Sequence, residues 1–598
     1  MKALLAPFVL LAAAPAAPPA IHLNQLGFLP DGPKRAVIAT DAATALDWQV
    51  VDAAGKVAAR GRTEPVGDDA ASGDKVQVAD FSGLTTPGEY RLRMAGAENK
   101  PFAVRAGLYA PLAKGALNFF YQQRAGVPIE ARFAGGERWA RPAGHKREVA
   151  ACFKGADPRG TVWPGCDYTI DVTGGWYDAG DHGKYVVNGG ISLWTLLNLY
   201  EVTRAFPDGS AALPEAGNGV SDLLDEARVE LDFLLRMQVP EGTRTSLPVG
   251  QQPRDRALTL TAVDAGGMAH HKIADANWTK LPMPPHEDRE TRLLYPPSTA
   301  ATLNLAAVAA QGARLWRTID PAFAARSLAA ARRAFAAAQR NPEVYAATAF
   351  TGSGGYGDAQ LADEFFWAAA ELYATTAEAP YRDVVTASPR YTDTPVSEPS
   401  WSDVGLLGTV TLATAPGIAE PVAAHERARL TALADRFAGE RAQTGYRIPY
   451  ATMRYPWGSN GAILNRGMIL GAAHKLSGKA EYRAAMIDTL DYVLGRNPID
   501  QSYVAGFGSR PLANPHHRFW APSLDKRLPG PPPGTLSGGA NNTAFADEVA
   551  KRSQGKCAPQ RCWADDIGAY AWNEVAINWN APLVWVAAYV DQAKPANP

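Results

Sequence analysis

The first absence in this sequence is that of a charge excess. The 598-residue chain carries 59 Lys and Arg residues against 60 Asp and Glu residues, which leaves a formal net charge of −1 at neutral pH. Proteins that bind nucleic acids or anionic membranes through phosphate groups need an excess or a patch of basic residues. The balance therefore argues against a nucleic acid or a membrane as partner, and a neutral ligand fits better.

The sequence also lacks an apolar run long enough to cross a membrane, which takes ~20 residues. Its one candidate is the start, MKALLAPFVLLAAAPAAPPA. There a lysine precedes about a dozen apolar residues, followed by small residues and prolines, as in a secretory signal peptide. We expect residues 1–17 to be a signal peptide, cleaved near Ala16 or Ala17, and the mature protein to be secreted or periplasmic.

Cysteine is scarce. An even number of cysteines in an exported protein is typical of disulfide bonds, and the local pairs are the simplest of the three possible pairings. The alternative is a zinc site of two cysteines with a nearby histidine such as His145, but the spacing matches no common zinc pattern. We therefore predict disulfides and assign no metal site to the four cysteines, Cys152, Cys166, Cys557 and Cys562.

Nucleotide-binding motifs are missing as well. No phosphate-binding loop, dinucleotide fingerprint or Gly-x-Ser-x-Gly elbow occurs in a convincing context. The glycine-rich GSGGYG at residues 352–357 follows no clear strand. A nucleotide-dependent reaction or a serine hydrolase is therefore not indicated.

Hydrophobic periodicity divides the rest of the chain into two regions, as its length leads one to expect. From Ile21 to about Val104, alternating runs such as RAVIAT and GEYRLRM are separated by Gly, Pro or Asp, which is typical of a small antiparallel β-sandwich. After Arg105, apolar residues recur at three- and four-residue spacing in Ala- and Leu-rich stretches, which predicts roughly eleven or twelve helices.

Many paired helices without a fixed-period repeat favour an α/α toroid over an α-solenoid. Ser221 and Ser298 directly precede two of the periodic stretches and are the expected N-caps of those helices. The loops between the helices are long and rich in Gly, Pro and aromatic residues. Loops of that length inside a compact domain usually carry function.

The stretch TGGWYDAGDHGKYVVNGG places Asp178 and Asp181 three residues apart, on a segment too rich in glycine for a stable helix. Gly180 permits a tight turn. Two carboxylates on such a turn can accept hydrogen bonds from one water, which suits a general base that deprotonates a nucleophilic water. Taken alone, the pattern also fits an acidic surface turn or a calcium loop.

Two clusters lie far downstream. In CWADDIGAYAWNEVAINWNAPLVW, we expect Glu574 to open an apolar helix among aromatic residues. Aromatic surroundings raise the pKa of a carboxyl. A general acid at neutral pH needs such a raised pKa. A glutamate that merely interacts with the helix dipole is the alternative. In SYVAGFGSRPLANPHHRFW, His516, His517 and Arg518 lie among aromatic residues, where such donors bind sugar hydroxyls or simply stabilise a loop.

These three stretches, in this order, resemble the motifs of family 9 glycoside hydrolases, the inverting cellulases. Ala505 stands where that family usually has Ser, Thr or Val. The N-terminal IHLNQLGFLPDGPKRAVI resembles the immunoglobulin-like module that precedes the catalytic domain in one subgroup. The resemblance implies an immunoglobulin-like β-sandwich over residues 21–104 and an (α/α)6 toroid catalytic domain over residues 105–594.

The resemblance also implies a role for each matching residue. Asp181 would be the general base, Asp178 would help to hold the attacking water, and Glu574 would be the general acid. An inverting hydrolase needs its acid and base carboxyl groups roughly 6.5–9.5 Å apart. The residues that would bind substrate or support the site are His516, Arg518, Tyr570, Asp565, His271, Asp363 and Trp401.

The implied reaction is the inverting hydrolysis of β-1,4-glucosidic bonds in cellulose or a related β-glucan, with endoglucanase as the first hypothesis. The long loops Thr243–Pro285 and Arg510–Asn542 are able to block one end of a cleft, so an exo-acting β-glucosidase, cellobiase or exo-β-glucosaminidase is the alternative. A non-catalytic carbohydrate-binding protein would lack one of the three carboxylates. A polysaccharide lyase would use Tyr, His or Arg as its base.

The expected partner is a β-glucan or cello-oligosaccharide, and the expected state is a monomer. No cofactor is required, although the acidic loops are compatible with a structural calcium ion. No cellulose-binding module follows residue 594, so we expect soluble glucan to be preferred over crystalline cellulose.

Overall fold

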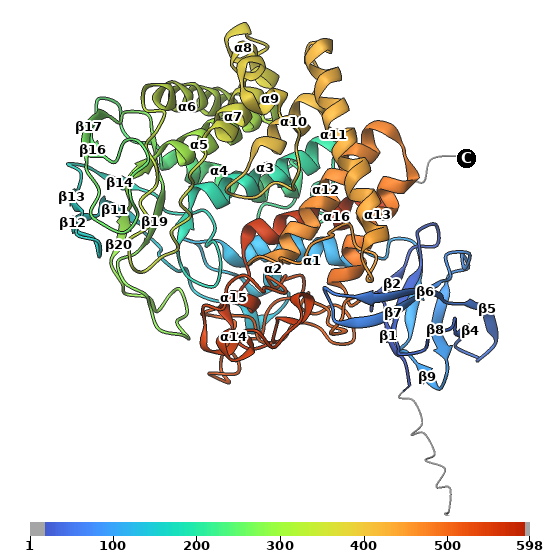
Figure 1. Cartoon of the computed structure of the whole chain (residues 1–598). Helices are drawn as coiled ribbons and strands as arrows, with labels where there is room; N and C mark the ends of the chain where they lie inside the picture. Colours follow the sequence, from blue (N-terminus) through green and yellow to red (C-terminus); the bar gives the residue numbers. More distant parts are fainter. Residues whose placement is uncertain (1–17, 593–598) are drawn as a thin grey trace, which may run out of the picture.

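The computed structural model describes residues 18–592, which form a small β domain followed by a large helical domain (Figure 1). The expected signal peptide, residues 1–17, lies outside this range. Among residues 18–592, no helix combines the length and the apolar character that crossing a bilayer requires.

The β domain consists of two facing sheets. One has the order β1-β3-β7-β6, and the other has the order β2-β10-β8-β4-β5 with β9 beside β8. The strands alternate between the core and solvent: Tyr90, Leu92 and Met94 of β8 point inward and meet Phe28 and Phe102. The bounds are β1 (Ala20–His22), β2 (Gly27–Phe28), β3 (Arg35–Ala39), β4 (Asp47–Asp52), β5 (Val57–Arg62), β6 (Glu64–Asp69), β7 (Asp74–Asp80), β8 (Gly88–Met94), β9 (Ala97–Glu98) and β10 (Phe102–Val104).

Six helices of the large domain contact one another in a closed ring, and each packs against one outer helix. The inner helix α5 is buried on almost every side, whereas its outer partner α6 buries one face, as expected for a helix inside and a helix outside a core. The inner ring is α3 (Val186–Thr203), α5 (Thr299–Leu315), α7 (Ala362–Thr376), α10 (Gly405–Thr414), α12 (Ser459–Ser477) and α16 (Ile577–Gln592). The outer partners, in the same order, are α4 (Asp222–Arg236), α6 (Pro321–Arg340), α8 (Ala379–Ala387), α11 (Glu420–Glu440), α13 (Ala480–Val493) and α1 (Ala110–Gln123).

One of the two expected helix caps differs from the prediction. The Ser298 hydroxyl accepts a hydrogen bond from the Ala301 amide at 3.1 Å and so caps α5. The Ser221 side chain does not cap α4; instead it donates to the carbonyl oxygen of Phe206 at 2.7 Å. The preceding loop brings that carbonyl within reach. The serine hydroxyl therefore donates to it and does not accept a hydrogen bond from the helix amides.

Short strands and helices form the loops at the ends of the ring. A five-stranded sheet in the order β14-β11-β20-β19-β15 leads directly into α3. The bounds are β11 (Val149–Cys152), β12 (Lys154–Ala156), β13 (Val162–Pro164), β14 (Thr169–Asp171), β15 (Lys184–Tyr185), β16 (Arg244–Leu247), β17 (Thr261–Asp264), β18 (Ala269–His270), β19 (Lys272–Asp275), β20 (Arg292–Leu294), β21 (Pro297–Ser298), α2 (Ala131–Ala134), α9 (Pro389–Thr392), α14 (Glu548–Ser553) and α15 (Tyr570–Asn573).

A buried polar network joins the two domains, which lie against each other beside α13 (Figure 1). The fully buried Arg496 donates to Asp488 at 2.7 Å and to Asp491 at 2.9 Å. Asn24 of the β domain donates to the same Asp491 at 2.8 Å. Because a buried charge that loses a partner is strongly destabilising, this network holds the β domain on the helical domain.

Candidate active site

Backbone hydrogen bonds bring the three chemistry-bearing segments together at one place, although they are far apart in sequence. The aspartate turn contacts both the histidine segment and the glutamate segment, and those two segments contact each other. The three bonds run from Ile577 N to Asp178 O (2.9 Å), from Arg518 N to Gly180 O (3.0 Å) and from His516 N to Asn573 O (2.9 Å). The site is therefore built on main-chain contacts, which fix its geometry independently of side-chain rotamers.

Gly180 is required at the centre of this arrangement. A Cβ atom added there would lie 2.3 Å from the carbonyl oxygen of His516, a distance that real Cβ atoms do not show. The aspartate turn lies so close to the histidine segment that only glycine fits between them. The glycine therefore allows a close approach of two chain segments as well as a tight turn.

Asp178 is fully buried, and protein donors already contact both of its carboxylate oxygens. Asn188 on α3 donates to the two oxygens at 2.9 and 3.1 Å, and the Tyr356 hydroxyl donates to Oδ2 at 2.8 Å. Burial raises the pKa of Asp178 to about 7, the charge of Asp181 adds to the rise, and the two donors oppose it. Asp178 is thus held rigidly, as a group that positions a water would be.

Asp181 has a freer carboxylate. Within residues 18–592, its one hydrogen bond comes from the Gly183 amide to Oδ1, at 2.7 Å. The buried Lys272 ammonium lies nearby: burial lowers the pKa of Lys272 to about 7, and the charge of Asp181 opposes that shift. A carboxylate with an uncommitted oxygen is well suited to accept a proton from water.

Glu574 lies in extended backbone between α15 and α16, three residues before the first residue of α16. The expectation that it opens the helix was wrong, because Glu574 pairs with His516 in an isolated parallel β-bridge and its carbonyl accepts from the Gly538 amide at 2.8 Å. Burial raises the pKa of Glu574 well above its ordinary value, and the charges of Asp181 and Asp178 raise it further. The raised pKa favours the protonated carboxyl, the form that a general acid requires.

His516 and Arg518 flank the carboxyl groups from one segment. His516 donates from Nδ1 to the Ile567 carbonyl at 2.6 Å, which leaves Nε2 available, and burial lowers its pKa so that the ring is neutral. The buried Arg518 is held by Gly180 O at 3.2 Å and by the Thr279 hydroxyl at 2.8 Å. One neutral imidazole and one fixed guanidinium at this place fit the binding of sugar hydroxyls.

Two exposed aromatic rings lie near the His516–Arg518 segment of the site. Trp278, 54% exposed, lies beside the Arg518 guanidinium at 5.7 Å from the ring centre. Trp457, 39% exposed, lies 5.7 Å from the ring of Tyr570, which in turn lies 5.6 Å from the His516 ring. Large exposed indoles are rare on a protein surface and offer flat apolar faces for a ligand.

The remaining predicted residues are placed around the site rather than in it. Asp565 accepts from the Ala513 and Asn514 amides at 3.0 and 2.7 Å, so it supports the loop before His516. Trp401 lies edge-on to Tyr356 at 5.2 Å, directly behind the ring that contacts Asp178.

His271 and Asp363 are buried and contact protein groups. The imidazole of His271 is hydrogen-bonded through Nδ1 to the Ser298 hydroxyl at 2.9 Å, and burial lowers its pKa to about 3. Asp363 accepts from the Val404 amide at 2.8 Å. Within residues 18–592, neither side chain forms a hydrogen bond or an ion pair with the three carboxyl groups.

The four cysteines form the two local disulfide bonds, Cys152–Cys166 and Cys557–Cys562. Thiolates for the alternative zinc site are therefore absent. His145, the histidine considered for that site, contacts the Tyr177 hydroxyl at 2.7 Å instead.

Two contacts of the site were not anticipated from the sequence, those of Asn188 and Tyr356. Asn188 belongs to the same glycine-rich stretch as the aspartates, and the signal would have been a polar residue in an otherwise apolar helix. Tyr356 lies in the glycine-rich GSGGYG segment, 178 residues after Asp178. That segment was considered only as a phosphate loop, and no local pattern connects it with the aspartates.

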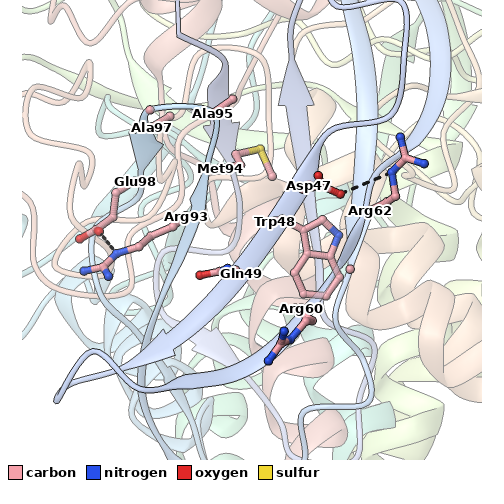
Figure 2. Close-up of a pocket in the computed structure, with 12 residues that line it drawn as sticks. Asp47, Trp48, Gln49, Arg60, Arg62, Arg93, Met94, Ala95, Ala97 and Glu98 are labelled. Atoms are coloured by element: carbon pink, nitrogen blue, oxygen red, sulfur yellow. Dashed lines mark hydrogen bonds and ion pairs between the residues drawn. The ribbon is translucent and has the colours of Figure 1, made fainter.

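A separate hollow lies on the β domain, on the face of β4, β5 and β8 (Figure 2). Two of its arginines are paired, Arg62 with Asp47 at 3.5 Å and Arg93 with Glu98. The hollow contains none of the predicted catalytic residues. We assign no chemistry to it.

Comparison with known proteins agrees with this geometry. The model of glycosyl hydrolase family 9 matches residues 109–587, and that of the cellulase N-terminal ig-like domain matches residues 16–99. Endoglucanase C of Cellulomonas fimi is 42% identical over 97% of this chain and 52% of its own length. Cellulose 1,4-beta-cellobiosidase of Acetivibrio thermocellus is 40% identical over 96% of this chain and 67% of its own length.

The chain thus spans between about half and two thirds of the length of these two relatives. A crystal structure of a metagenome-derived glycoside hydrolase family 9 endoglucanase has the same fold, with a TM-score of 0.82 at 33% identity, over 96% of this chain and 99% of that one. Since the family model covers most of the chain and the motifs converge in one site, the protein is a glycoside hydrolase that belongs to family 9 and carries the N-terminal immunoglobulin-like domain of the cellulases.

Proposed function

We propose that the protein hydrolyses β-1,4-glucosidic bonds of cellulose or related β-glucans as an inverting endoglucanase. The observation that carries the proposal is the pairing of Glu574, a carboxyl with a raised pKa, with two aspartates on a backbone-linked turn. An inverting glycosidase needs such an acid and a base with a water between them. The endoglucanase and cellobiosidase relatives support the substrate class.

In the proposed reaction, Asp181 is the base and Glu574 is the acid. The Glu574 carboxyl donates its proton to the glycosidic oxygen as the bond to the anomeric carbon breaks. Asp181 takes a proton from the water that attacks the opposite face, and the product has the inverted configuration. Asp178 fixes the water beside Asp181, because its own oxygens are held in place by Asn188 and Tyr356. Proton exchange with solvent then restores both groups.

Sugar hydroxyls are proposed to contact Arg518 and His516, and sugar faces to stack on Trp278 and Trp457. Both indoles are exposed, and each lies next to a polar residue of the site or its neighbour. Two stacking platforms near the site would give a glucan chain contacts beyond the sugar at the cleaved bond, which favours cleavage within the chain.

Exo action is the second candidate. The two long loops singled out in the sequence both reach the site: Thr279 of the first accepts from Arg518, and Gly538 of the second donates to the Glu574 carbonyl. Loops that border the catalytic residues are in position to close one end of a cleft. The cellobiosidase relative supports this candidate.

The acidic cluster of Asp358, Asp363 and Glu364 supports the proposal of a structural calcium ion. Both carboxylate oxygens of Glu364 are buried without a hydrogen-bond partner, and so are one oxygen of Asp358 and one of Asp363. Burial and the neighbouring Asp363 and Asp358 raise the pKa of Glu364 well above its ordinary value. Arg390 lies 3.8 Å from Asp363 Oδ1 and offsets part of the negative charge. Oxygen-rich clusters are the ligand sets that Ca²⁺ prefers, so an ion here would offset the rest.

The finer assignments follow the sequence. We propose a signal peptide over residues 1–17, an immunoglobulin-like β-sandwich over residues 21–104 and an (α/α)6 toroid over residues 105–594. The closed ring of inner helices, each with one outer partner, supports the toroid. We further propose that the protein is exported and acts as a monomer on a polysaccharide or oligosaccharide.

A proton NMR time course with cellopentaose tests the proposal. Cellobiose and cellotriose that first appear as the α-anomer support an inverting endoglucanase. Glucose released one unit at a time supports exo action, and initial release of the β-anomer refutes inversion. Glu574→Gln serves as the inactive control, because it removes the proposed acid and keeps the side-chain shape.

A further inference from the structure

We propose that His145, His182 and Asp288 form a binding site for one divalent transition-metal ion, with Zn²⁺ as the favoured ion. One nitrogen from each imidazole and one carboxylate oxygen lie within 4.8 Å of one another. The site is separate from the three catalytic carboxyl groups and from the acidic cluster of Glu364. The proposal does not depend on the polysaccharide specificity.

The three groups converge from separate segments onto one carboxylate oxygen. His182 Nδ1 lies 2.5 Å from Asp288 Oδ2, and His145 Nε2 lies 3.6 Å from the same oxygen. The second distance is too long for a hydrogen bond. A zinc ion has ligands at about 2.0–2.2 Å from histidine nitrogen or carboxylate oxygen, so small side-chain rotations would place an ion among the three atoms.

Unpartnered nitrogens point to a missing ligand. Nε2 of His145 and Nε2 of His182 are both buried and have no hydrogen-bond partner. The side chains of His145, His182 and Asp288 are 7%, 3% and 0% exposed. A buried polar atom without a partner is costly, and coordination of a metal ion would use at least one of these nitrogens.

The surroundings resemble the support of a metal ligand. His145 Nε2 is the ring nitrogen near Asp288. The other ring nitrogen, Nδ1, lies 2.7 Å from the Tyr177 hydroxyl, which fixes the orientation of the ring. Asp288 Oδ1 accepts from the Glu290 amide at 2.8 Å, which leaves Oδ2 for the ion. Ligands whose second polar atom is fixed in this way are typical of metal sites.

The electrostatics near the cluster permit a dication. Arg292 contacts the His182 carbonyl at 2.8 Å, but its charge is shared with Glu148 and Asp275, at 2.7 Å each. Two neutral imidazoles and one carboxylate suit Zn²⁺ better than Ca²⁺ or Mg²⁺, which prefer oxygen ligands. Water would complete a four-coordinate sphere.

The position of the site gives the ion a structural role. His182 follows Asp181 directly, and Asp288 belongs to the same loop as Thr279, whose hydroxyl accepts a hydrogen bond from Arg518. A bound ion would therefore tie that loop to the aspartate turn. We expect Zn²⁺ to raise the melting temperature, by an amount that increases with the free metal concentration.

The test uses tag-free full-length protein treated with a chelator and then dialysed into buffer with excess Ca²⁺, which occupies oxygen-rich sites. Zn²⁺ is titrated by calorimetry, and Co²⁺ is added to follow the visible absorption of tetrahedral cobalt. We expect one strong site per chain. His145→Gln and Asp288→Asn should each weaken Zn²⁺ binding at least ~100-fold, since loss of supporting groups alone costs 10–100-fold.

His286→Gln is the matched control, because His286 is the histidine nearest to Asp288 in sequence but lies outside the cluster. It should bind Zn²⁺ like the parent chain. An equal loss in His286→Gln, or no binding by the parent chain at micromolar Zn²⁺, overturns the proposal. If a variant does not fold, a zinc anomalous peak in crystals of the parent chain decides: a peak among the three side chains supports the site, and its absence there refutes it.

Discussion

The hydrogen bond from Tyr356 to Asp178 offers the sharpest test of the site. In Tyr356→Phe the ring keeps its contacts with Tyr185 and Trp401, at 4.6 and 5.2 Å, and only the hydroxyl is lost. That hydroxyl donates to Asp178 Oδ2 at 2.8 Å and stabilises the ionised carboxylate. The substitution therefore removes one donor from the charged form of Asp178 and leaves the packing intact.

The size of the effect follows from the strength of that bond. A hydrogen bond to a charged group contributes about 1.5–3 kcal/mol, and 1.36 kcal/mol corresponds to one pKa unit. The pKa of Asp178, already raised to about 7 by burial, should rise by about one to two further units. If catalysis requires ionised Asp178, the acid limb of the pH profile of kcat/KM shifts to higher pH by the same one to two units. The rate then falls about tenfold or more below the limb and recovers above it.

The assay is a pH profile of kcat/KM on a chromogenic cello-oligosaccharide. Tyr446→Phe is the matched control, because Tyr446 also donates to an aspartate, Asp74, at 2.8 Å, but between the two domains. It should leave the profile unchanged. A loss in Tyr356→Phe that is uniform across the pH range would show that the hydroxyl does not act through the ionisation of Asp178.

Five further outcomes are expected. Glu574→Gln should lower kcat at least ~10³-fold, because one acid–base group usually contributes about 10²–10⁴-fold to the rate. Because the raised pKa of Glu574 makes its ionised form destabilising, the variant should also melt higher than the parent chain, by a margin that grows as the pH rises above the ordinary carboxyl pKa. Trp278→Ala and Trp457→Ala should each raise KM for cellopentaose about tenfold, the equivalent of ~1.4 kcal/mol of stacking; unchanged KM in both would exclude the platforms. A calcium chelator should lower the melting temperature of the parent chain but not that of Glu364→Gln. Reduction of the Cys152–Cys166 disulfide, whose cysteines are 14 residues apart, should lower the free energy of unfolding by about 3 kcal/mol, as measured by denaturant titration.

The carboxyl groups that we propose as catalytic could be singled out because their surroundings leave local marks in the sequence. Asp178 and Asp181 share a glycine-rich turn, and Gly180 turns out to be the one residue type that fits against His516. The two-domain division was likewise predictable, since a change of hydrophobic period from two to about 3.6 marks the boundary directly. Both features depend on residues close to one another in the chain.

Contacts between distant segments were not predictable in the same way. Tyr356 contacts Asp178 across 178 residues, and its own surroundings read as a glycine-rich loop. Glu574 looked like the start of a helix because its neighbours are apolar, yet the bridge to His516 holds it in extended backbone. Local propensity fails where a tertiary contact satisfies the backbone groups instead.

The same contacts explain why this site needs a large helical frame. The raised pKa values of Asp178 and Glu574 mean that the folded state holds carboxyl groups where their ionised forms are unfavourable. Each such group lowers stability at neutral pH, and a loop could relieve the cost by moving the carboxyl into water. The main-chain bonds of the aspartate turn to Arg518 and Ile577 prevent that movement, and the buried inner helix α16 holds Ile577 in place. Asp178 and Glu574 therefore keep their raised pKa values because the frame is rigid, and changes that loosen the frame should lower activity before they unfold the protein.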